Sequence, residues 1–143
     1  WAPPIAGRWF TKAVNPVYAM EFMARQFDSR FPEVALSYLE NAQEHATGAK
    51  VLALASGIAR RHHELAREFR KQQQPEQASL HFERALALDP RAEFLLDYGT
   101  MLASYGNLGA AAGLLGEALE LEPDLKPARR ALEMVEKLQK EGR

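Results

Sequence analysis

Apolar side chains recur at helical spacing along most of this chain. Between residues 92 and 104, apolar or small residues fall three or one positions apart, at Leu95, Tyr98, Gly99 and Leu102. This spacing predicts a helix. The pattern breaks at Gly106 and Asn107, which tolerate the left-handed backbone angles that end helices. A second helical set follows and closes before Pro123, because a proline forces its preceding residue out of the helical region.

The same spacing predicts further helices, at residues 15–27, 32–45, 49–73, 75–88 and 127–140. Asn15 is a favourable N-cap, and Pro16 suits the first helical position. Two of these helices read as copies of one another: PEVALSYLENA begins at Pro32 and PEQASLHFERA begins at Pro75. The closing prolines of the last two units lie 33 residues apart. A helix–turn–helix unit of about 34 residues is therefore indicated as a repeat.

These residues resemble the tetratricopeptide repeat (TPR) family, most specifically over residues 59–125. The last unit has bulky, small and proline residues where the family expects them, at Leu95, Tyr98, Gly99, Leu102, Ala111, Leu115, Ala118, Leu121 and Pro123. The unit before it repeats part of this spacing at Ala78, Phe82 and Ala85. The resemblance implies an all-α fold, a TPR-like right-handed α-solenoid of about three helical hairpins plus a C-terminal capping helix.

This interpretation divides the chain into five segments. They are an N-terminal arm at 1–14, a divergent TPR-like hairpin at 15–48, a TPR hairpin with an extended first helix at 49–91, a further TPR hairpin at 92–125 and a capping helix at 126–143. The first hairpin departs from the family at Met23, where a small residue is expected, and lacks the closing proline. The last helix has one apolar stripe and a polar opposite face, which suits the end of a stack.

Small residues are expected where the two helices of a hairpin approach closely. Ala66 and Ala78 form one such pair, and Gly99 and Ala111 form the next. Close helix packing is also expected at the glycines of the 108–121 helix, namely Gly109, Gly113 and Gly116. These glycines do not form a phosphate-binding loop, because no Lys-Ser/Thr pair follows them and no strand precedes them.

Composition narrows the possible chemistry. The chain has 143 residues, of which 47% are hydrophobic and 26% charged, and a net charge of −1 gives no general reason to expect nucleic acid. Without cysteine it has no disulfide, thiolate nucleophile or thiolate metal ligand. His62 and His63 are adjacent, so on a helix they point about 100° apart and cannot easily share a metal ion. We therefore expect no metal, no cofactor and no catalytic residue.

The N-terminal residues admit two interpretations. No apolar run approaches the ~18 residues of a membrane span. Residues 1–12 nevertheless mix aromatic, proline and basic side chains, as at Trp1, Arg8, Trp9 and Lys12. This mixture suits a juxtamembrane arm, in which tryptophan and basic residues lie at the headgroup level. The alternative is an arm that packs on the protein's own surface. Because the chain starts at Trp1 rather than Met, we expect a fragment or a processed form.

The densest basic run lies within residues 60–71. In the register of the family, the expected partner-binding face comprises Arg60, His63, Arg67 and Arg70, joined by Glu93, Leu96, Asp97 and Thr100 from the next hairpin. An acidic segment or a C-terminal carboxylate of a partner could dock there through charge-assisted hydrogen bonds. The alternative is an ordinary solvated helix face. The carboxylate-clamp subtype of the family needs lysine and asparagine where His63, Arg67 and Asp97 stand, so its specificity is not carried over.

The resemblance implies a non-enzymatic protein-interaction module that holds a partner protein or peptide. We expect the intact protein to belong to an assembly such as a bacterial envelope, secretion or polysaccharide-export apparatus. It would be attached to the membrane only through a segment before Trp1, with a cytoplasmic location favoured over a periplasmic one. The alternatives are a soluble chaperone for a secreted protein and a regulatory fragment of a larger enzyme.

Overall fold

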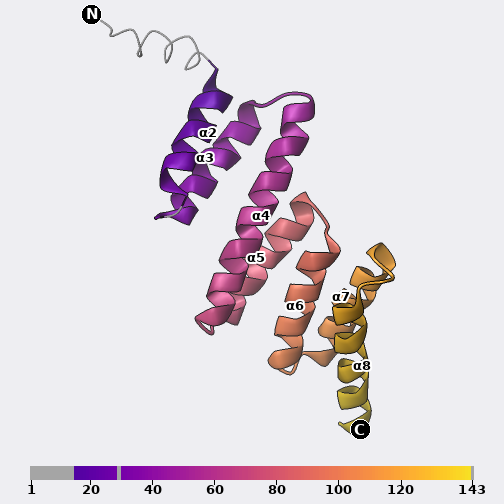
Figure 1. The fold of residues 1–143 in the computed structure, drawn as a ribbon. Helices are drawn as coiled ribbons and strands as arrows, with labels where there is room; N and C mark the ends of the chain where they lie inside the picture. Colours follow the sequence, from indigo (N-terminus) through magenta and orange to yellow (C-terminus); the bar gives the residue numbers. More distant parts are fainter. Residues whose placement is uncertain (1–14, 29, 143) are drawn as a thin grey trace, which may run out of the picture. The chain divides into compact units, whose positions relative to one another are not determined.

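The computed structural model describes residues 15–28 and 30–142, so the predicted arm at 1–14 lies outside the described residues. Within these ranges the chain forms α-helices and no strand (Figure 1). They are α2 (Pro16–Phe27), α3 (Pro32–His45), α4 (Ala49–Lys71), α5 (Pro75–Leu88), α6 (Ala92–Ser104), α7 (Leu108–Leu121) and α8 (Lys126–Glu141). The chain divides into two compact units, one ending at Arg61 and one beginning at His62. The boundary falls inside α4, so this helix contributes residues to both units, and the division into repeats by residue range stays a prediction.

Local signals start the helices where the sequence predicts. The side-chain Oδ1 of Asn15 accepts a hydrogen bond from the backbone N–H of Val17 at 3.1 Å, which caps α2. Pro16 occupies the first turn of the same helix, where its missing N–H costs nothing. Prolines occupy the first turn of α3, α5 and α8 as well. α8 begins at Lys126, one residue before the predicted start.

Left-handed residues end two helices of the second unit. Gly106 has a φ of 84° after α6, as expected for a turn glycine. α4 ends at Lys71 rather than at the predicted position 73, because Gln73 takes a φ of 58°. The N–H of Gln74 then donates to the carbonyl of Phe69 at 2.9 Å, the hydrogen bond of a Schellman C-cap. The same cap follows α6, so both turns satisfy carbonyls that the helix ends would leave unpaired.

The first unit is a hairpin of α2 and α3 together with the first part of α4. Its buried side chains are mostly small or aliphatic, and include Ala24, Ala35, Leu36, Leu39, Ala42, Leu54 and Ile58. The rings of Phe27 and Tyr38 stack at 5.9 Å and join the two helices of the hairpin. Two ion pairs connect the hairpin to α4, Lys50 with Glu21 at 2.7 Å and Arg61 with Asp28.

The second unit stacks the end of α4 with α5, α6, α7 and α8. One apolar cluster joins α4, α5 and α6, and contains Ala66, Ala78, Phe82, Tyr98 and Met101. The rings of Phe82 and Tyr98 stack at 5.2 Å, and the Tyr98 hydroxyl donates to Glu83 Oε1 at 3.0 Å. A second cluster joins α6, α7 and α8 through Leu95, Leu115 and Val135. α6 therefore packs on both sides, which is how a repeat buries an apolar face that it cannot bury alone.

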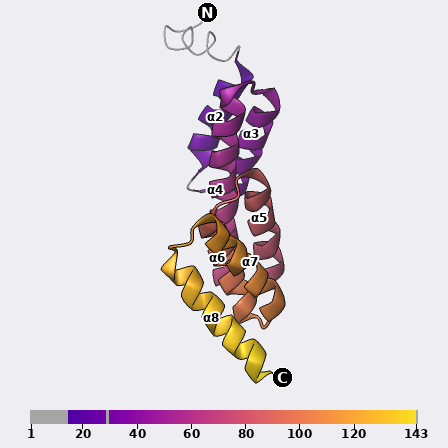
Figure 2. The same cartoon turned by 90° about the vertical axis from the view of Figure 1, so that its right-hand side faces the viewer.

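α8 covers the open side of the α6–α7 hairpin. It lies beside both helices and buries Ala128 and Val135 against them (Figures 1 and 2). Its outward face carries Arg129, Arg130, Glu133 and Lys137, as expected for a capping helix. Leu138, which the sequence places on the buried stripe, is 41% exposed because it lies near the end of the helix, beyond most of the packing surface.

The glycines of the second unit fall into two groups. A Cβ at Gly99 would lie 2.9 Å from Leu115 Cγ, so this glycine allows the close contact of α6 with α7 that the sequence predicts. The expectation of close packing at Gly109, Gly113 and Gly116 is wrong. A Cβ at any of these three would meet no atom within 4 Å, because they lie on the side of α7 that faces open space.

Candidate protein-binding surface

A polar cluster connects α4 and α6 within the second unit. His63, Arg67 and Arg70 are spaced four and three residues apart on α4, so they share one helix face. Asp97 and Thr100 are three residues apart on α6. His63 and Asp97 are separated by 34 positions, the length of one repeat, so they occupy equivalent places in consecutive hairpins. The register of the repeat therefore brings these two helix faces together.

His63 is the buried centre of this cluster. Its Nε2 lies 2.6 Å from Asp97 Oδ2, within a hydrogen bond that joins the two helices. The imidazole stacks on Phe94 with ring centroids 4.5 Å apart and also contacts the ring of Phe82. The register of the repeat predicts His63 on an accessible face, but the residue is only 4% exposed. The apolar body of the ring fills the space between the two phenylalanines, while one nitrogen reaches the carboxylate.

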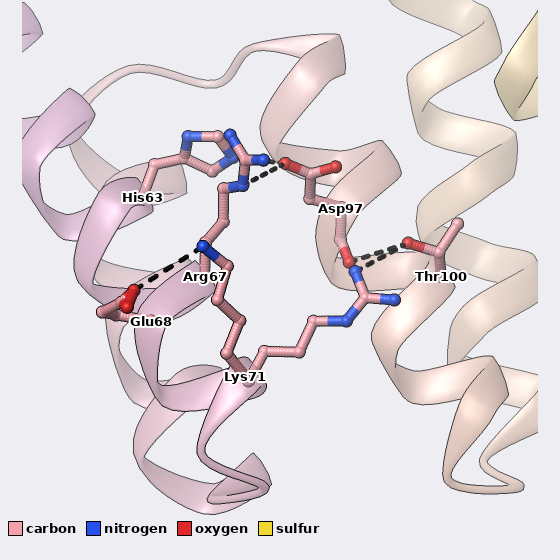
Figure 3. A network of polar contacts seen from close by, with 7 residues as sticks. His63, Arg67, Glu68, Lys71, Asp97 and Thr100 are labelled. Atoms are coloured by element: carbon pink, nitrogen blue, oxygen red, sulfur yellow. Dashed lines mark hydrogen bonds and ion pairs between the residues drawn. The ribbon is translucent and has the colours of Figure 1, made fainter.

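The charged side chains around His63 stay accessible. Arg67 has a side chain 58% exposed, and its Nε lies 3.9 Å from the Asp97 oxygen that His63 contacts (Figure 3). Arg70 Nη1 donates to Thr100 Oγ1 at 3.4 Å, and this hydroxyl donates to the backbone carbonyl of Asp97 at 3.0 Å. One buried group thus anchors a carboxylate, and exposed Arg67 and partly exposed Arg70 lie near it.

The remaining predicted residues are placed differently. Glu93 is exposed on α6, one turn before Asp97, and Leu96 is partly buried against the α6–α8 cluster. Arg60 is exposed on α4 but belongs to the first compact unit. The structure therefore joins five of the predicted residues through contacts, namely His63, Arg67, Arg70, Asp97 and Thr100. We call Arg67, Arg70, Glu93, Asp97 and Thr100 the α4–α6 surface.

A histidine pair that was not predicted from the sequence connects α4 and α5 next to this cluster. The Nδ1 atoms of His62 and His81 are 2.9 Å apart, and Phe69 stacks on the His81 ring with centroids at 5.4 Å. Burial, followed by the neighbouring His81 and Arg84, lowers the pKa of His62 to about 4. The sequence did hold a signal. If Ala66 faces Ala78 in an antiparallel pair, then His62, one turn earlier on α4, lies opposite residues 81–82 of α5.

Other kinds of site find little support in the described part of the chain. No three His, Asp or Glu side chains converge there as a metal site. No helix in residues 15–28 or 30–142 is long and apolar enough to cross a membrane. A polar cavity of about 290 Å³ lies in the first unit, between α2 and the start of α4. The Glu21–Lys50 ion pair lines it, so its charges already neutralise one another.

Comparisons with known proteins agree with this architecture. The sequence profile of the tetratricopeptide repeat matches residues 59–92. Among solved structures, the C-terminal TPR-containing domain of a Plasmodium falciparum protein described as FK506-binding is similar. The identity is 19%, the match covers 90% of this chain and 91% of that chain, and the TM-score is 0.58. A search of curated proteins found no match.

The fold class is therefore the one predicted from the sequence, an all-α TPR-like solenoid. Proteins of this class are modules for protein–protein interaction. Residues 59–92, which include the end of α4 and all of α5, match one tetratricopeptide repeat.

Proposed function

We propose that this chain is a non-enzymatic scaffold that holds a partner protein on the α4–α6 surface. The observation that carries the proposal is the convergence of charged side chains from consecutive repeats. Arg67 and Arg70 lie on α4, Asp97 lies on α6, and the two helices meet through the partly buried hydrogen bond of His63 with Asp97. A solvated helix face needs no such anchor between helices.

The hydrogen bond between His63 and Asp97 favours binding because it orders the α4–α6 surface before the partner arrives. Immobilising a long side chain on binding costs about 0.5–1.5 kcal/mol. The contact of Arg70 with Thr100 and the position of Arg67 beside Asp97 remove part of that cost in the free protein. Both guanidinium groups keep donors for carboxylates, which they bind through short, charge-assisted hydrogen bonds. An acidic segment of the partner is therefore the proposed ligand.

Reversal of both charges tests this proposal. Arg67→Glu with Arg70→Glu should reduce partner capture at least tenfold in a pull-down with the whole chain, followed by identification of the retained proteins. Lys126→Glu with Arg130→Glu, on the exposed face of α8, is the matched control with the same change in net charge. Far-UV circular dichroism checks that both variants keep their helices. Equal capture by the α4 variant would remove this surface from consideration.

We further propose that the scaffold works in a membrane-attached assembly, such as a bacterial envelope, secretion or polysaccharide-export apparatus. The support is the mixture of tryptophan and basic side chains in residues 1–12. Co-sedimentation with anionic vesicles measures whether this segment binds a membrane surface.

A further inference from the structure

The α4–α6 surface has two edges of opposite charge. Arg67 and Arg70 give the α4 edge its positive charge, and Glu68 on that helix is offset by Lys71 at 3.8 Å. Glu93 and Asp97 lie one turn apart on α6 and give that edge a negative charge. A partner that contacts both helices must therefore face positive charges on α4 and negative charges on α6. The charge of the surface is therefore a pattern across two helices and not a uniform basic patch.

Asp97 cannot swing away from an arriving partner. Its Oδ2 is held by His63, whose ring is fixed between Phe94 and Phe82. The side chain is still 27% exposed. Figure 3 shows its second oxygen on the side opposite to His63, without a contact to the residues drawn. A fixed carboxylate with one accessible oxygen accepts a cation or an N–H donor and repels another carboxylate.

We propose that Asp97, supported by Glu93, determines specificity at this surface. The partner segment would be a helix with a row of Glu or Asp along one edge and a row of Lys or Arg along the other. The acidic row pairs with Arg67 and Arg70, and the basic row pairs with Glu93 and Asp97. Spacings of three and four residues match, because both partners would be helices. This inference rests on the proposed function and adds that an acidic segment alone is a poor ligand.

Three peptide probes of equal length test the charge pattern. The mixed probe carries glutamates at i, i+4 and i+8 and lysines at i+1, i+5 and i+9, so that the two rows lie about 100° apart along the edges of one helix face. The acidic probe replaces its lysines with glutamine, and the basic probe replaces its glutamates with glutamine. Fluorescence anisotropy with the whole chain should give a Kd for the mixed probe at least tenfold below that of either other probe. An acidic probe that binds as tightly as the mixed one would overturn the inference.

The substitution Asp97→Asn tests the residue itself. Asparagine keeps the size of the side chain and an oxygen for His63, but it removes the charge. The preference for the mixed over the acidic probe should fall at least fivefold, because the acidic probe gains affinity. Glu93→Gln, an exposed position, should shift the preference in the same direction without touching the buried anchor. Glu120→Gln on α7, also exposed, is the control and should leave the preference unchanged.

The two proposals fail in different ways. If neither Asp97→Asn nor Glu93→Gln changes the preference, Asp97 does not determine specificity, while loss of capture by the Arg67/Arg70 variant would still support the scaffold surface. If no probe binds and that arginine variant also captures its partner normally, both proposals are wrong.

Discussion

The two neighbouring histidines of α4 show how one residue type acquires different roles from its surroundings. His63 donates a hydrogen bond from Nε2 to the Asp97 carboxylate and stacks on Phe94, so its environment contains a negative charge. His62 faces another histidine, with Arg84 also near, and is 2% exposed. The two nitrogens that meet at 2.9 Å have room for one proton between them. A second proton would place two N–H donors against each other.

Acidification should therefore destabilise the second unit. The pKa of His62 falls from 6.5 to about 4 in the folded protein, so the unfolded chain binds more protons between these values. Stability that is present at pH 7 should be lost as the pH falls through this window, by on the order of 2 kcal/mol at pH 4.5. Urea unfolding at pH 7 and pH 4.5, followed by circular dichroism, measures the difference.

Matched variants identify the histidine responsible. His62→Gln should reduce the loss of stability between pH 7 and pH 4.5. His45→Gln, at an exposed position near the end of α3, should leave it unchanged. A pH dependence that survives in His62→Gln would show that another group causes it.

At the scale of elements, the helices were predictable and their contacts were less so. Asn15, Gly106 and the prolines act on the backbone within a few residues, so the sequence shows where helices start and stop. The burial of His63 depends on Phe94, which is 31 positions away in the sequence. The register of the repeat predicts which helix face carries His63, but it does not predict how deeply the side chain is buried. The left-handed Gln73 escaped prediction because glutamine has no preference for that conformation.

Glycines of the α6–α7 hairpin offer a test of helix packing. Gly99→Ala should lower the free energy of unfolding by about 1–3 kcal/mol, because the added methyl group meets fully buried Leu115. Gly113→Ala adds the same methyl group into open space in the middle of α7, and should instead raise stability by roughly 0.5–1 kcal/mol. Chemical denaturation compares the two. Similar effects of both substitutions would contradict the close contact at Gly99.

At the scale of the whole molecule, the fold class and the partner-binding surface depend on different features of the sequence. The repeat period can be recognised in the sequence, so the all-α TPR-like fold class could be predicted. The matched repeat and the similar domain confirm this fold class. The face used for binding depends on which charges meet across helices. Arg67 and Asp97 are 30 residues apart in the sequence. They come close only when α5, which lies between them in the sequence, has folded. Arg60, chosen for the same basic run, belongs to the other compact unit.

The membrane proposal concerns the chain as a whole and yields its own prediction. The proposed anchor lies before Trp1, but residues 1–143 should still co-sediment weakly with vesicles that contain phosphatidylglycerol, because tryptophans enter the interface and basic residues approach anionic headgroups. Removal of residues 1–14 should reduce the bound fraction several-fold. Trp1→Ala with Trp9→Ala should do so without a change in charge. Equal sedimentation of the shortened chain would favour an arm that lies on the protein's own surface.

The separation of His63 and Asp97 by one full repeat has a consequence for how this gene can change. One codon inserted in the turn before α6 lengthens a loop and leaves the phase of the helix free to adjust. One codon inserted inside α6 ahead of Asp97 rotates that carboxylate by about 100° around the helix axis and away from the imidazole. Insertions and deletions should therefore be tolerated between the helices and rejected within them.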